Sequence, residues 1–258
     1  IQEAINDYNK SRNEGIRKYS LMASFNARLL SNIPGIADKQ SNELYRSMLD
    51  LALMINTTFI EMESYIEGVP MRGWPFKIKS DIIEFDSYQG GHMMEAVALA
   101  AEQAAIHGDN EIAISLALTV AAALHDGFLT KDLRRTKVRE DGSVVYVPAS
   151  SPNSRKERFL EAHPERVCIH QPQPINHGLV VASAGIGLLR AFGAIGWLDS
   201  TNESKSLWKL VDGDGSKIEL VDYLVDLKNF VSGSADIFIG MCSICLLYTS
   251  DAADERLG

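Results

Sequence analysis

The stretch Asp86-Ser-Tyr-Gln-Gly-Gly-His92-Met-Met-Glu95-Ala-Val-Ala-Leu-Ala-Ala101 decides how the rest of this sequence is interpreted. A polar segment with two glycines and a histidine leads directly into a run of small apolar residues. Helices that are apolar on all sides are buried in large helical proteins, and alanine-rich surfaces let helices approach closely. We therefore predict a buried helix over 89–107 whose first turn lies at a loop-lined end of the fold.

A second stretch has the same organisation. His170-Gln-Pro-Gln-Pro-Ile-Asn176-His177-Gly178 is followed by Leu-Val-Val-Ala-Ser-Ala, which predicts a helix over 176–197. A short turn at 108–110 predicts that 89–107 and a helix over 111–127 form an antiparallel hairpin, and a helix over 217–231 pairs with 176–197. The two helix pairs, each opening on a histidine-bearing segment, form a weak internal repeat of the kind found in helical arrays and toroids.

The remaining segments complete the predicted architecture. Apolar residues recur three and four apart over 40–66, which predicts a further helix, and 67–87 is predicted as a loop. The long polar segment 128–175 holds Asp141-Gly142 before alternating residues, which predicts a small β-hairpin, and a short helix is expected near 154–162. The predicted fold class is all-α: antiparallel helical hairpins forming a partial (α/α) toroid, with a small β-hairpin in a long loop.

The two ends of the sequence suggest a gene fragment. The chain begins at Ile1, and the run that starts at Cys245 looks like a translated sequencing adapter. We therefore expect residues 1–244 to form one partial toroid domain, truncated at both ends, from an environmental (metagenomic) gene fragment. Residues 245–258 are expected to be an artefact tail and take no part in the fold.

Composition and charge argue against several classes of partner. The net charge is −9 over 258 residues, whereas nucleic-acid binding requires basic patches. The apolar stretch 178–198 resembles a membrane span, but Arg190 and five glycines interrupt it, which favours a buried helix. The three cysteines form neither a disulfide framework nor a metal cluster. We therefore predict no nucleic-acid partner, no membrane span, no metal and no other cofactor.

The order of these motifs resembles a known superfamily. Gly73-Trp74-Pro75, the stretch 86–94, the buried helical pair, Gln173-Pro-Ile-Asn176-His177 and Leu188-Leu-Arg-Ala-Phe192 are similar to segments of helical-toroid (α/α) carbohydrate-active proteins. These include six-hairpin glycosidases, polysaccharide lyases and the helical domain of glucuronyl epimerases. The resemblance covers roughly 40–231. It implies a polysaccharide or oligosaccharide substrate, held in a cleft at one end of the toroid, and a periplasmic or extracellular location.

The candidate catalytic residues are His92, His177, Asp86 and Glu95. Imidazoles exchange protons near neutral pH, and a helix N-terminus favours an anion such as a uronate carboxylate. Glu95 lies three residues after His92, on the same helix face. Each histidine has an alternative role as a helix cap or a buried polar group. The carboxylate of Asp126 is a further candidate for acid–base chemistry.

The candidate substrate-binding residues are drawn from the loops and helix starts: Trp74, Tyr88, Gln89, Asn176, Arg72 and Tyr146. Flat aromatic rings stack on sugar faces, and an arginine binds carboxylates through two hydrogen bonds. The alternatives are that the aromatic residues anchor loops in the core and that Arg72 forms an ion pair at the surface.

Two reactions remain open at this point. In glycoside hydrolysis, Asp86 and Glu95 would divide the acid and base roles. In β-elimination, a His or Tyr would remove the C5 proton of a uronate, while Asn176, His177 or Arg72 would stabilise the charge that develops. The rival class is a non-catalytic helical module that binds a glycan or another protein, and an isoprenoid-handling helical barrel is a weaker third alternative.

Overall fold

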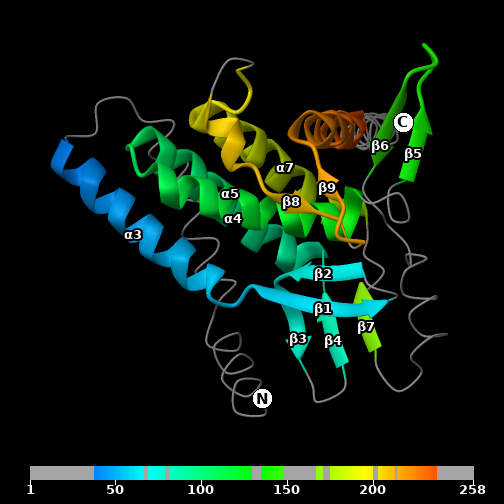
Figure 1. Ribbon diagram of the computed structural model, residues 1–258, viewed down its shortest axis with the longest axis horizontal. Helices are drawn as coiled ribbons and strands as arrows, with labels where there is room; N and C mark the ends of the chain where they lie inside the picture. The colour runs from blue at the N-terminus through cyan, green and yellow to red at the C-terminus, as the bar shows by residue number, and fades with distance from the viewer. Residues whose placement is uncertain are drawn as a thin grey trace, which may run out of the picture.

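The computed structural model describes residues 38–66, 69–78, 82–85, 87–129, 135–147, 167–170, 175–199, 203–212 and 214–236. This part of the chain is mostly helical, which agrees with the predicted all-α class. The helices gather on one side of the molecule, and the sheets β1–β2 and β3–β4–β7 lie below them (Figure 1).

The bounds of the elements define this arrangement. The helical elements are α3 (Asp38–Asn56), α4 (Ser87–Ile106), α5 (Asn110–Leu124), the π-helical turn η1 (His125–Leu129), α7 (Ile175–Ile195), the 3-10 turn η2 (Glu203–Leu207) and a last helix over 220–236. The strands are β1 (Ile60–Ile66), β2 (Val69–Gly73), β3 (Pro75–Ile78), β4 (Ile82–Phe85), β5 (Arg135–Val138), β6 (Val144–Val147), β7 (Val167–His170), β8 (Leu210–Val211) and β9 (Lys217–Ile218).

The helix predicted over 40–66 is correct only as far as Asn56. Residues Ile60–Ile66 form β1, which pairs antiparallel with β2. The sequence Ile-Glu-Met-Glu at the start of β1 alternates apolar and polar residues, a period of two that suits a strand. The loop predicted over 67–87 is also wrong, because it contains β2, β3 and β4.

The β-hairpin predicted at Asp141-Gly142 is confirmed. Strands β5 and β6 pair antiparallel, with Arg135 opposite Val147 and Val138 opposite Val144. Gly142 has a φ of 81°, a left-handed conformation that glycine adopts without steric cost. The short helix predicted near 154–162 lies outside the described residues, as do the whole of 1–37 and 237–258.

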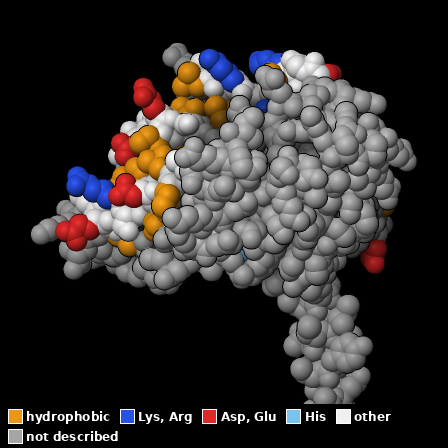
Figure 2. All heavy atoms as spheres, turned by 90° about the horizontal axis from the view of Figure 1, so that it is seen from below, with side chains coloured by type: hydrophobic (Ala, Val, Ile, Leu, Met, Phe, Trp, Pro, Cys, Tyr) orange, Lys and Arg blue, Asp and Glu red, His pale blue; other side chains and the backbone are white. Residues whose placement is uncertain are grey.

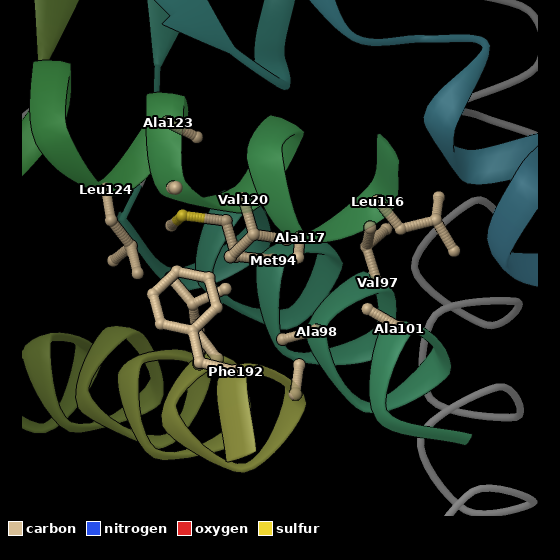
Figure 3. Packing of buried hydrophobic residues seen from close by; sticks show 14 of the residues in the cluster. Met94, Val97, Ala98, Ala101, Leu116, Ala117, Val120, Ala123, Leu124 and Phe192 are labelled. Atoms are coloured by element: carbon tan, nitrogen blue, oxygen red, sulfur yellow. The ribbon is translucent and has the colours of Figure 1, made fainter. Parts of the chain in front are cut away.

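Helix α4 is the centre of the hydrophobic core. Its residues from Met93 to Ala101 are all buried, and it packs against α3, α5 and α7. Figure 3 shows that α4 and α5 run antiparallel, because Met94 lies toward Leu124 whereas Ala101 lies toward Leu116. The predicted hairpin over 89–127 is therefore confirmed, with the difference that α5 ends at Leu124 and continues as a π-helical turn.

Helices α4 and α7 run parallel and in a constant register. The hydroxyl of Ser183 bonds Glu95 and the guanidinium of Arg190 bonds Glu102, and each pair is separated by 88 residues in the sequence. Two contacts with the same separation, two turns apart, require the helices to advance in the same direction. A Cβ atom built on Gly187 between them would lie 3.2 Å from the Cβ of Ala98, so the two helices approach closely.

The last helix packs antiparallel against α7, as predicted. A Cβ built on Gly185 would lie 3.0 Å from Val231, and the ring of Phe192 contacts that of Tyr223 at a centroid distance of 6.2 Å. Earlier residues of α7 therefore meet later residues of the last helix. That helix begins at residue 220 rather than 217, because Lys217–Ile218 form β9 and pair with β8.

The segment Asn110–Leu129 is long and apolar enough to cross a membrane by composition, but 67% of its apolar window is buried within the described fold. That burial is the pattern of a core helix.

The coloured surface in Figure 2, at the end of the molecule where α3 begins, mixes acidic, basic and hydrophobic side chains.

The close approach of α4 and α7 predicts opposite effects for two glycine substitutions in α7. Gly187→Ala should destabilise the protein by about 1–3 kcal/mol, because its Cβ meets an alanine Cβ that has no rotamer to change. Gly193→Ala is the matched control, since its Cβ meets only a Leu198 methyl at 3.6 Å. It should stabilise the helix by up to about 1 kcal/mol through helix propensity alone. Urea unfolding measures both, and equal stabilities would contradict the close approach.

Candidate functional site

The two histidine-bearing helix starts are brought to one edge of a sheet. Strands β4 and β7 pair in parallel, from Ile82 opposite Val167 to Phe85 opposite His170. Helix α4 begins two residues after β4 ends, and α7 begins five residues after β7 ends. The carboxyl ends of parallel strands lie at a common edge, so both helices start there and run away from it side by side.

The register of α4 and α7 places the backbones of the two histidines close together along the helix pair. In this register each residue of α7 lies beside the residue of α4 that precedes it by 88 positions, so His177 is level with Gln89. His92 is three residues further along, a rise of about 4.5 Å. His177 therefore lies in the first turn of α7 and His92 in the second turn of α4. This placement rests on the backbones alone, because the side chain of His177 lies outside the described part of the chain.

His92, Glu95 and Ser183 form a polar group between these helices. Nδ1 of His92 lies 3.9 Å from Oε2 of Glu95, and the hydroxyl of Ser183 donates a 2.7 Å hydrogen bond to Oε1 of Glu95. The exposed fractions are 15% for the His92 side chain and 7% for that of Glu95. A carboxylate is thus held on the Nδ1 side of an imidazole at the start of α4.

This arrangement suits proton transfer rather than attack by serine. In a nucleophilic triad the hydroxyl is hydrogen-bonded to the imidazole, whereas Ser183 bonds the carboxylate. Because the carboxylate lies on the Nδ1 side of the ring, the other ring nitrogen, Nε2, is the atom of His92 that could accept a proton from a substrate.

A second buried polar cluster surrounds the π-helical turn at the end of α5. Asp126 accepts hydrogen bonds from Nε and Nη2 of Arg72, both at 2.8 Å, and from the backbone N–H of Arg72 at 2.9 Å. Nη2 of Arg72 also bonds the carbonyl of Val211 at 2.8 Å. One side chain therefore joins β2, the π-helical turn and β8.

Two further groups complete this cluster. Nε2 of His125 lies 3.2 Å from Oδ1 of Asp212, and the hydroxyl of Tyr223 donates a 3.0 Å hydrogen bond to the carbonyl of Ala121. Burial raises the pKa of Tyr223 well above its ordinary value, and the nearby charge of Asp126 raises it further. The cluster is internally paired, which is the pattern of a structural brace.

Two of the predicted substrate-binding residues have internal roles in the structure. Trp74 is 2% exposed, its indole N–H bonds the carbonyl of Ile55 at 3.1 Å, and its ring meets Phe59 edge-on. Neither ring face is open to stack on a sugar, which favours the alternative that Trp74 anchors the loop in the core. The ion pair expected of Arg72 is present, but at 10% and 2% side-chain exposure it is buried rather than at the surface.

The other predicted site residues are only partly visible. Asp86 lies outside the described residues, and for Tyr88, Gln89, Tyr146, Asn176 and His177 the structure describes the backbone alone. Tyr88 and Gln89 lie in the first turn of α4, and Asn176 and His177 lie in that of α7. Tyr146 lies on β6, in a hairpin that pairs with neither β4 nor β7. Four of these five residues thus share the end that holds His92.

Sequence reasoning did not single out Ser183 or His125. Ser183 sits within an apolar run, so only the register of α7 against α4 reveals that its hydroxyl meets Glu95. His125 directly precedes Asp126 at the end of an apolar helix, a signal that could have marked this position. Among the described residues, no group of three or more His, Cys, Asp or Glu side chains is arranged to hold a metal ion.

Comparison with models of protein families, with curated proteins and with solved structures found no match for this chain. Function is therefore inferred from the residues themselves, and the group His92–Glu95–Ser183 is the strongest candidate.

The buried ion pair predicts a large loss of stability for Asp126→Asn. Removing the charge leaves the Arg72 guanidinium buried without its carboxylate, which should cost about 3–5 kcal/mol. Lys217→Gln is the matched control, because it breaks the exposed pair with Glu219 and should change stability by less than about 1 kcal/mol. Urea unfolding of both variants measures the difference. A small loss for Asp126→Asn would show that the pair does not brace the fold.

The raised pKa of Tyr223 predicts a loss of stability in alkali. The folded state keeps this phenol protonated above the ordinary value of about 10, so its contribution is complete below pH 10 and declines as the pH rises further. Tyr223→Phe cannot ionise and should lose less stability than the wild type between pH 9 and 11, both values being set about one unit either side of the ordinary pKa. Parallel curves of unfolding free energy against pH would contradict this assignment.

Proposed function

We propose that this chain is part of a carbohydrate-active enzyme that cleaves a uronate-containing polysaccharide by β-elimination. The observation that supports this most is the pairing of His92 with Glu95 at the start of α4, beside the start of α7. An imidazole that can accept a proton thus lies near two helix N-termini, and helix N-termini favour the binding of a carboxylate.

The proposed architecture is a partial (α/α) toroid. In an array of helical hairpins, the first helix of each hairpin packs beside the first helix of the next and runs in the same direction. The parallel packing of α4 and α7, each followed by an antiparallel helix, supports this arrangement. The sheet edge at the start of both helices is where we propose that the polysaccharide binds.

The proposed reaction breaks one C–H bond and one C–O bond of the substrate and forms one double bond, without any change of oxidant or reductant. Nε2 of His92 takes the proton from C5 of a uronate, the electron pair of that C–H bond forms the C4=C5 double bond, and the bond from C4 to the glycosidic oxygen breaks. That oxygen leaves with the next sugar and takes up a proton from water, and the His92 imidazolium then returns the C5 proton to water. The negative charge on the uronate carboxylate increases as the C5 proton departs, and backbone N–H groups at the two helix starts, with the side chains of Asn176 and His177, would stabilise it.

The surroundings of Glu95 favour elimination over hydrolysis. A hydrolase needs two carboxyl groups that flank the glycosidic bond. Glu95 is nearly buried, and its oxygens face Ser183 and His92. It is therefore better suited to orient His92 than to protonate a sugar oxygen. The rival function, a non-catalytic module that binds a glycan or a protein, is separated from the proposed one by the following experiment.

His92→Gln should abolish elimination by the chain on uronate polymers, because glutamine cannot accept the C5 proton. The loss should be at least about 100-fold in kcat, with binding of the polymer largely retained. The measurement is the ultraviolet absorbance of the unsaturated uronate product over a panel of polyuronates, with polymer binding followed by calorimetry.

His107→Gln is the control for this experiment. His107 follows the other end of α4, where its ring stacks on Tyr45, and its replacement should leave turnover unchanged. Polymer binding without any unsaturated product would favour the binding module. Release of reducing ends without unsaturation would show hydrolysis, and full activity of His92→Gln would refute the assigned base.

A further inference from the structure

We propose that Ser183 of α7 is a positioning residue for His92 of α4. Its hydroxyl fixes the carboxylate of Glu95, and that carboxylate in turn orients the imidazole. This inference rests on the proposed function for its catalytic meaning, although the contacts that carry it are independent of any substrate.

The contacts form a chain from one helix to the other. The hydroxyl of Ser183 lies 2.7 Å from Oε1 of Glu95, an ordinary length for a charge-assisted hydrogen bond. Oε2 of the same carboxylate lies 3.9 Å from Nδ1 of His92, which is within the range of an ion pair but too long for a hydrogen bond. A movement of this oxygen by about 1 Å would close the gap to hydrogen-bonding distance or open it beyond ion-pair range.

The surroundings make this hydroxyl an important donor. Ser183 lies among Val181, Ala182 and Ala184, which are buried apolar residues, and the α4 residues on either side of Glu95 are equally apolar. A nearly buried carboxylate that loses a hydrogen-bond donor turns toward other donors or takes up a proton more readily. Either response weakens the negative charge beside His92.

A second contact between α4 and α7 serves as a control, because its loss affects the packing of the two helices but not the position of the Glu95 carboxylate. Arg190 of α7 bonds Glu102 of α4 at 2.9 Å, with the same separation of 88 residues. It joins the same two helices about two turns further from the sheet edge, and its side chain is 43% exposed. Loss of this contact weakens the pairing of α4 with α7 without touching Glu95.

The test compares Ser183→Ala, Ser183→Thr and Arg190→Gln. The first readout is the NMR signal of the His92 ring, assigned from the spectrum of His92→Gln. Ser183→Ala should shift this signal, because the carboxylate beside the ring changes its position. Ser183→Thr keeps a hydroxyl and should restore the wild-type signal, whereas Arg190→Gln should leave the signal unchanged.

The second readout is turnover. Ser183→Ala should lower kcat by about tenfold and change the pH–rate profile, with KM changed less than about twofold. In Glu95→Gln, which has already lost the carboxylate charge, adding Ser183→Ala should have no further effect on either readout.

The outcomes distinguish this inference from the proposed function. A His92 ring signal that shifts in Ser183→Ala, in a protein without turnover, supports the positioning role and counts against elimination. Turnover by the wild type with an unchanged His92 ring signal and an unchanged pH–rate profile in Ser183→Ala overturns the positioning role and leaves elimination standing. Equal shifts in Ser183→Ala and Arg190→Gln would also overturn it, because they would show an effect of helix pairing alone.

Discussion

The close parallel contact between α4 and α7 is the constraint on which the rest of the structure depends. A Cβ atom on Gly187 would lie only 3.2 Å from that of Ala98, and this close approach allows short side chains to bond across the interface. Ser183 reaches Glu95 only because the two backbones are near each other. The same contact, together with the parallel pairing of β4 and β7, holds two histidine-bearing helix starts at one edge of a sheet.

Much of the helical framework was predictable from the sequence. The apolar runs after His92 and after His177 predicted α4 and α7 to within two residues at each end, and the glycine of Asp141-Gly142 predicted the hairpin. These features depend on local periodicity and turn chemistry, which a sequence displays directly. Strand β1 was missed because its apolar residues also fit the helical spacing of 40–66, and β2, β3 and β4 were missed because they are short. The pairing of β4 with β7 joins segments 85 residues apart, as in Phe85 opposite His170.

The candidate site was predictable only in part. Its position followed from the polar segments before the two helices, and the neighbouring placement of His92 and Glu95 followed from helical spacing. The contribution of Ser183 depends on the register of two helices that are far apart in sequence, which no local pattern contains. Trp74 and Arg72 had the expected chemistry, but burial assigns them to the core and to an ion pair, and burial is a property of the whole fold.

The π-helical turn at the end of α5 has a consequence for how the two sides of the molecule are joined. Asp126 lies within this wider turn, and its carboxylate accepts three hydrogen bonds from Arg72 of β2. The same guanidinium bonds the carbonyl of Val211 in β8. The irregular end of α5 is therefore where the helical layer is attached to both β2 and β8, so a change of backbone geometry at this turn acts directly on the buried ion pair.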